Sequence, residues 1–128
     1  MTTSKRCLIV DDSGVIRKVT RVILEDLRFS VQEAENAQEA LELCKAEMPA
    51  LILLDWHIPG MNSFDFITAL RAAQRNRRPF VIYCTTEYDT NDITKALQFG
   101  ADDFLMKPFD RCALEAKLAE IHTVAALV

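Results

Sequence analysis

The stretch Ala50-Leu51-Ile52-Leu53-Leu54 is an unbroken run of apolar residues, and Asp55 follows it directly. The run shows none of the alternation between polar and apolar side chains that marks a strand with one face in water. A continuous apolar run of this length is typical of a strand that is buried on both faces of a parallel sheet. It therefore predicts a parallel sheet that is covered by helices on both sides.

Short apolar runs and longer amphipathic stretches alternate on both sides of this segment. The apolar runs predict five strands, at 7–10, 30–34, 50–54, 80–84 and 103–106. The amphipathic stretches predict five helices, at 13–27, 37–47, about 64–70, about 93–99 and about 110–121. Strands and helices that alternate in this way indicate an α/β fold, a doubly wound parallel sheet in a three-layer sandwich.

The expected packing of two helices follows from their sequences. In the first, Ile16, Val19, Ile23 and Leu27 recur at the spacing of one helix face, which we expect to lie against the sheet. The fourth is expected to stop at Gly100. Two strand orders are plausible for such a sheet, and in either of them ligands bind beyond the carboxyl ends of the strands, where the winding reverses.

The chain has 128 residues, of which 27% are charged, and a net charge of −4. These values predict one domain over residues 1–128, with its core at about 5–121, in a soluble cytoplasmic protein. The mild acidity argues against nucleic-acid binding, and no apolar run reaches the roughly 20 residues that span a membrane. Because the cysteines are isolated from one another, we expect buried reduced thiols rather than disulfides or a metal cluster at Cys7, Cys44, Cys84 and Cys112.

Polar side chains follow four of the predicted strands directly. The carboxyl ends of parallel strands meet at one edge of a sheet, so these residues are expected to converge there: Asp11, Asp12, Asp55, Thr85, Thr86 and Lys107. Three carboxylates so close together repel one another unless a cation lies among them. Oxygen ligands suit Mg²⁺, with Mn²⁺ also possible, and an acidic cluster without nearby His or Cys ligands argues against zinc.

Lys107 and Thr85 would complete a site for a phosphoryl group, since an ammonium can neutralise one phosphoryl oxygen and a hydroxyl can donate to another. Phosphoryl transfer requires mainly positioning and neutralisation of charge. An aspartate carboxylate is a competent nucleophile toward phosphorus, and Asp55 is the best candidate because it ends the most buried run. Polar residues that merely cap the strands are the plainer alternative, but four strand ends supply acids, hydroxyls and an ammonium together.

The chain resembles the receiver domains of two-component response regulators, including the single-domain chemotaxis type, from about residue 5 to 121. Five motifs carry the resemblance: Val10-Asp11-Asp12-Ser13, Leu54-Asp55-Trp56-His57-Ile58-Pro59-Gly60-Met61, Cys84-Thr85-Thr86-Glu87, Gly100-Ala101-Asp102-Asp103-Phe104 and Lys107-Pro108-Phe109. The resemblance implies a flavodoxin-like sheet with the strand order 2-1-3-4-5. It also implies a cis peptide bond between Lys107 and Pro108.

The same resemblance implies how the site accepts phosphate. Asp55 would take a phosphoryl group from a histidine kinase or a histidine phosphotransfer protein. Asp12, Asp55 and the backbone carbonyl of His57 would bind Mg²⁺ directly, and Asp11 would hold the ion through water.

The resemblance further implies a conformational switch. Thr85 and Lys107 would bind the phosphoryl oxygens, and Phe104 would turn inward as Thr85 moves. The face made by the fourth helix, fifth strand and fifth helix would then change and bind a protein target. His57 and Glu87 stand where the family varies and tunes the lifetime of the phosphoryl group.

Two features stand apart from the family pattern. Asn62-Ser63 occupies the place of the Asp-Gly that many relatives have, so the loop before the third helix is expected to differ. A basic cluster lies near the end of that helix and is either a solvated helix end or a site for an anionic ligand: Arg71, Arg75, Arg77 and Arg78.

Three functions remain open on the sequence. The first is a signalling switch, not an enzyme beyond its own phosphoryl transfer and dephosphorylation. The second is a phosphate sink or phosphorelay carrier without an output target. The third, a small phosphatase, is disfavoured because His57 stands where a second acid would be expected. The sequence leaves open whether the protein is a monomer or dimerises on phosphorylation.

Overall fold

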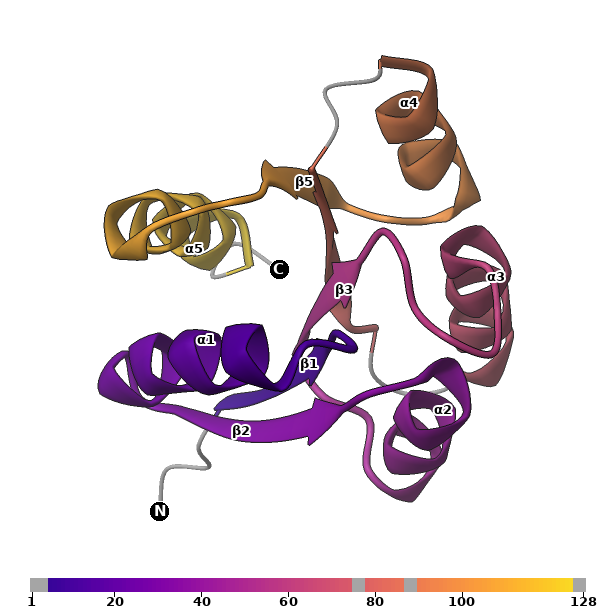
Figure 1. Ribbon diagram of the computed structural model, residues 1–128, viewed down its shortest axis with the longest axis horizontal. Helices are drawn as coiled ribbons and strands as arrows, with labels where there is room; N and C mark the ends of the chain where they lie inside the picture. The colour runs from indigo at the N-terminus through magenta and orange to yellow at the C-terminus, as the bar shows by residue number, and fades with distance from the viewer. Residues whose placement is uncertain (1–4, 75–77, 87–89, 126–128) are drawn as a thin grey trace.

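The computed structural model describes residues 5–74, 78–86 and 90–125. Strands and helices alternate along the chain as β1 (Lys5–Val10), α1 (Gly14–Asp26), β2 (Phe29–Ala34), α2 (Ala37–Ala46), β3 (Leu51–Asp55), α3 (Ser63–Ala73), β4 (Phe80–Thr85), α4 (Thr90–Phe99), β5 (Asp103–Met106) and α5 (Arg111–Ala125). The strands form one parallel sheet in the order β2-β1-β3-β4-β5. Helices α1 and α5 cover one face of the sheet, and α2, α3 and α4 cover the other (Figure 1). The predicted fold and strand order are confirmed.

Strand β3, which contains the apolar run that predicted the sheet, lies in the middle of the sheet. All residues of β3 are buried, and the strand pairs with β1 on one side and β4 on the other. The strand runs one residue further than the sequence pattern indicated, since Asp55 is paired with Cys84. The nucleophile candidate therefore belongs to the end of the central strand, which is a rigid position.

Short polar side chains begin three of the helices. Ser13 accepts a hydrogen bond from the amide of Ile16 at 3.3 Å, and Asn36 accepts one from the amide of Glu39 at 2.8 Å. Asn62 accepts one from the amide of Phe64 at 2.7 Å. Each of these bonds satisfies an amide that has no partner inside its own helix. Ser13 and Asn62 thus start α1 and α3 directly after the loops that follow Asp11 and Asp55, whereas Asn36 starts α2 after β2.

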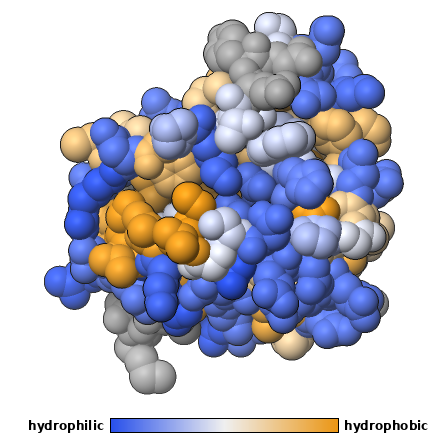
Figure 2. Space-filling model, viewed as in Figure 1, coloured by the Kyte–Doolittle hydropathy of each residue, from blue (hydrophilic) through white to orange (hydrophobic). Residues whose placement is uncertain are grey.

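The predicted buried face of α1 is only partly right. Thr20, Ile23 and Leu24 are the buried residues of this helix, whereas Val19 is 57% exposed. The helix is therefore turned from the predicted face, and a threonine takes a place that the apolar pattern could not reveal. The exposed apolar side chains of α1 form the apolar patch that lies over this helix in Figure 2: Val15, Ile16, Val19 and Val22.

The cysteines are free thiols, but the expectation that all are buried is wrong for one of them. Cys7, Cys44 and Cys84 are buried, and burial raises the pKa of Cys44 to about 11 and that of Cys84 to about 12. Cys112 is exposed, because the buried face of α5 is built by Leu114 and Leu118 instead. Among the helices that the structure describes, none is long and apolar enough to cross a lipid bilayer.

Candidate functional site

The polar residues predicted from the strand ends do gather at one edge of the sheet. Asp11 follows β1, Asp55 ends β3, Thr85 ends β4 and Lys107 follows β5, and these four strands are neighbours. Asp11, Asp12 and Asp55 each present a carboxylate oxygen, and the three oxygens lie within 4.8 Å of one another. Asp11 and Asp55 are buried and Asp12 is exposed, so the acidic cluster opens to solvent on the side of Asp12.

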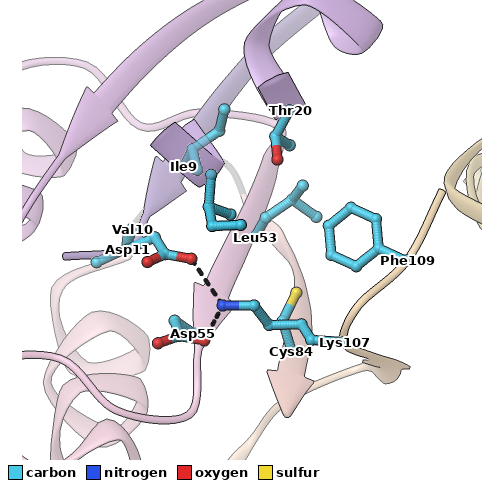
Figure 3. Close-up of a pocket in the computed structure, with 10 residues that line it drawn as sticks. Ile9, Val10, Asp11, Thr20, Leu53, Asp55, Cys84, Lys107 and Phe109 are labelled. Atoms are coloured by element: carbon cyan, nitrogen blue, oxygen red, sulfur yellow. Dashed lines mark hydrogen bonds and ion pairs between the residues drawn. The ribbon is translucent and has the colours of Figure 1, made fainter. Parts of the chain in front are cut away.

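Lys107 ties the two buried carboxylates together. Its Nζ lies 2.9 Å from Oδ2 of Asp11 and 2.8 Å from Oδ1 of Asp55, as Figure 3 shows. The backbone amide of Lys107 donates to the carbonyl oxygen of Thr85 at 2.7 Å. The peptide bond between Lys107 and Pro108 is cis, as expected. These contacts fix the ammonium beside the carboxyl end of the central strand.

The floor of the site is apolar. A small cavity beside Asp11, Asp55 and Lys107 is lined further by Ile9, Val10, Ile16, Thr20, Leu53, Cys84 and Phe109 (Figure 3). Water is scarce against such a wall, so charges interact there more strongly than at an open surface. An apolar floor with charges at its rim suits the stabilisation of a phosphoryl group.

Burial and neighbouring charges oppose each other at Asp55. Burial raises the pKa of its carboxyl group, the hydrogen bond from Lys107 lowers it, and the negative charge of Asp11 raises it again, with a raised pKa as the result. For Lys107, burial lowers the pKa, but the hydrogen bonds and charges of Asp55 and Asp11 outweigh it and leave the pKa raised. Three carboxylates face one ammonium, so the site carries excess negative charge when all are ionised. A divalent cation fits this oxygen-only donor set.

The turn after Asp55 is held by hydrogen bonds on both sides. The amide of Trp56 donates to the carbonyl oxygen of Cys84 at 2.7 Å. The backbone N–H of His57 lowers the pKa of the Asp55 carboxyl group. The hydroxyl of Ser63 lies 2.9 Å from the carbonyl oxygen of Asp55 and 2.9 Å from that of Trp56. Sequence reasoning singled out Asn62-Ser63 as a departure but gave Ser63 no role, since a serine at a helix start has no distinctive signal.

The residues of the predicted switch lie on the neighbouring strands. Thr85 is buried at the end of β4, and Phe104 of β5 pairs in register with Tyr83. Phe104 is half-buried, and Nζ of Lys117 on α5 lies 5.5 Å from the centre of its ring. Lys117 also pairs with Asp103 at 3.2 Å. Glu87, the second residue expected to tune the phosphoryl lifetime, lies outside the described residues.

The described part of the basic cluster is engaged within the fold. Arg71 donates to the carbonyl oxygens of Gly100 and Pro79 and pairs with Asp102 at 3.0 Å, and Arg78 pairs with Asp102 at 2.7 Å. These contacts tie the end of α3 and the segment before β4 to the turn before β5, which favours the structural interpretation for both arginines. Arg75 and Arg77 lie outside the described residues.

Comparison with known families gives one match over most of the chain. The model of the response regulator receiver domain family matches residues 7–119. Among curated proteins, the chain is 33% identical over 118 residues to the phosphate regulon transcriptional regulatory protein PhoB of Escherichia coli, covering 92% of this chain and 52% of the relative. It is 31% identical over 122 residues to the chemotaxis protein CheY-3 of Vibrio cholerae, covering 94% of each. The chain thus spans about half the length of PhoB and nearly all of CheY-3.

Solved structures show the same architecture. The chemotaxis response regulator CheY4 of Vibrio cholerae superposes with a TM-score of 0.87 at 28% identity, covering 93% of this chain and 99% of that one. A CheY-like receiver domain protein from Methanospirillum hungatei superposes with a TM-score of 0.83 at 30% identity, covering 92% and 93%.

Proposed function

The chain belongs to the response regulator receiver domain family, and we propose from this membership and from its site that it is a switch phosphorylated on Asp55. One observation carries the proposal. The carboxylate at the end of the central strand lies within reach of two further carboxylates and one ammonium, at 4.8 Å or less and 2.8 Å respectively. This arrangement supplies a nucleophile, oxygen ligands for a cation and a positive charge for a phosphoryl oxygen.

The proposed reaction is transfer of a phosphoryl group from a phosphohistidine of a histidine kinase or phosphotransfer protein. A carboxylate oxygen of Asp55 forms a bond to phosphorus while the bond from phosphorus to the histidine nitrogen breaks, and the electron pair of that bond leaves with the imidazole. Lys107 neutralises charge on the phosphoryl oxygens, and the hydroxyl of Thr85 donates to one of them. The chain would catalyse only its own phosphoryl transfer and dephosphorylation, so we infer a signalling protein rather than an enzyme with turnover. We also propose that it acts in the cytoplasm.

The acidic residues would hold Mg²⁺, with Mn²⁺ also suitable. Asp12 and Asp55 would bind the ion through their carboxylates, His57 through its backbone carbonyl, and Asp11 through water. The ion would supply neutralisation of charge on the incoming phosphoryl group. The excess negative charge of the cluster and its exposed side at Asp12 support this assignment.

Asp12→Asn is expected to weaken Mg²⁺ binding by about tenfold or more, because one charged oxygen ligand is lost. The fluorescence of Trp56 can report the binding, since this residue adjoins Asp55 and is 38% exposed. Titration of the metal-free protein with Mg²⁺ would give the affinity, with Glu42→Gln on the exposed side of α2 as a control. Equal affinities of the Asp12 variant and the unsubstituted chain would contradict the assignment of Asp12.

Phosphorylation is proposed to act on the face formed by α4, β5 and α5. The new phosphoryl oxygens attract Lys107 and the hydroxyl of Thr85, and movement of Thr85 leaves room for Phe104 to turn toward the core. A protein target that binds the altered face more tightly then shifts the population toward it. Phe104 has a half-buried ring that lies beneath the ammonium of Lys117. A half-buried ring can turn toward the core or toward solvent, which supports this mechanism.

The ring of Phe104 is expected to change rotamer when the protein is phosphorylated with acetyl phosphate and Mg²⁺. Nuclear Overhauser effects between this ring and Tyr83 or Lys117 would follow the change. The Asp55→Asn chain under the same conditions should keep the unphosphorylated pattern. One unchanged rotamer in fully phosphorylated protein would rule out Phe104 as the switch.

A further inference from the structure

The hydroxyl of Ser63 lies against both of the peptide groups that follow Asp55. In the first, between Asp55 and Trp56, the N–H donates to the carbonyl oxygen of Cys84, and the carbonyl oxygen lies 2.9 Å from the Ser63 hydroxyl. In the second, between Trp56 and His57, the carbonyl oxygen also lies 2.9 Å from that hydroxyl, and the N–H lowers the pKa of the Asp55 carboxyl group. The single proton of the hydroxyl is shared between the two carbonyl oxygens. Among the described contacts, Ser63 is the one side chain that contacts both groups.

A planar peptide group makes these contacts interdependent. The carbonyl of Trp56 and the N–H of His57 belong to one rigid unit and point in opposite directions. When Ser63 holds the carbonyl on one side, the N–H is aimed at the Asp55 carboxylate on the other. Donation to a carbonyl also polarises the N–H of the same peptide group and strengthens its attraction to a carboxylate.

The position of Ser63 makes this contact stable. It is the first residue of α3, it is 4% exposed, and the helix start is fixed separately by the N-cap Asn62. A buried hydroxyl bonded to backbone from a rigid helix has little freedom to move away.

We propose that Ser63 is a positioning residue, whose buried hydroxyl fixes the two peptide groups after Asp55 and so orients the phosphoacceptor carboxylate and the N–H of His57. The inference rests on the proposed function for its chemical consequence, but the coupling from Ser63 to the amide of His57 is a property of the metal-free protein. A serine that only satisfies its own hydroxyl at a helix start would stabilise the fold without affecting that amide.

Ser63→Ala and Asn62→Ala form a matched pair for the test. Both remove a polar group from the start of α3, but Asn62 bonds to the amide of Phe64 and has no hydrogen bond to the turn after Asp55 among the described contacts. Both variants are expected to unfold at a lower temperature than the unsubstituted chain. Only Ser63→Ala is expected to speed hydrogen exchange of the His57 amide in metal-free protein, by about tenfold. Only Ser63→Ala is expected to slow phosphorylation by acetyl phosphate at saturating Mg²⁺, also by about tenfold.

Unchanged exchange at His57 together with an unchanged phosphorylation rate in Ser63→Ala would overturn the inference and leave the proposed function intact. Equal losses in both variants would also overturn it, because they would reflect the helix start alone. If the unsubstituted chain takes up no phosphate at all, the proposed function fails. The exchange of His57 then still decides whether Ser63 positions the turn.

Discussion

The Asp55→Asn chain is expected to gain no phosphoryl group from acetyl phosphate, and to be at least as stable as the unsubstituted chain. The amide of asparagine keeps the shape of the side chain but is not a nucleophile toward phosphorus, so uptake should fall below detection. The gain in stability follows from the raised pKa of Asp55, which burial causes first and the charge of Asp11 increases. Its charged form is penalised in the folded protein, and asparagine removes that charge.

The stability of Asp55→Asn relative to the unsubstituted chain should depend on pH. Folded protein binds the Asp55 proton more tightly than unfolded protein, so the stability due to this group falls as the pH rises from the ordinary aspartate pKa to the raised one. The advantage of Asp55→Asn should therefore be small in acid and larger at neutral pH. Thermal unfolding across this range would measure it, with Glu42→Gln as a control. Phosphorylation of the Asp55 variant at the normal rate would place the acceptor elsewhere.

Lys107→Met is expected to slow phosphorylation by about 10²-fold or more and to destabilise the metal-free protein. The substitution removes the ammonium that lies 2.9 Å and 2.8 Å from the carboxylates of Asp11 and Asp55, so the transferred group loses its fixed positive charge. Two buried carboxylates are then left facing each other, and removal of one partner from a buried ion pair is costly. The length of methionine keeps most of the packing against the apolar floor.

Two conditions should rescue the stability of Lys107→Met without restoring its activity. Acid protonates Asp55, whose raised pKa rises further once the ammonium is gone, so the stability difference should be smaller at acidic pH than at neutral pH. Mg²⁺ should also reduce the stability difference between Lys107→Met and the unsubstituted chain, because the cation neutralises the acidic cluster. Thermal unfolding at acidic and at neutral pH, with and without Mg²⁺, tests this beside Lys45→Met on the exposed side of α2. If Lys107→Met is phosphorylated as fast as Lys45→Met, Lys107 has no part in the transfer.

The central strand and the site could be predicted from the sequence because both follow from simple rules. A doubly buried strand appears as an unbroken apolar run, and residues after parallel strands meet at one edge of the sheet. These rules predict that Asp11, Asp55 and Lys107 lie together at one edge of the sheet, where the structure places them. The strand order and the cis bond before Pro108 required the family resemblance, since the residues alone left two orders open.

The parts that sequence reasoning missed depend on packing between distant segments. The exposure of Val19 reflects the rotation of α1 against its neighbours, and an apolar pattern with valines at Val15, Val19 and Val22 is compatible with more than one buried face. Cys112 is exposed because Leu114 and Leu118 form the buried face of α5. The contact of Ser63 with backbone carbonyls seven and eight residues away is a product of the loop that closes between them.

The most direct test of the phosphoacceptor site is the intact mass of the unsubstituted chain after incubation with acetyl phosphate, with and without Mg²⁺. The account predicts the gain of one phosphoryl group that requires the cation, is lost in Asp55→Asn and is slowed in Lys107→Met. No gain in the presence of Mg²⁺, or an equal gain in the Asp55 variant, would contradict it.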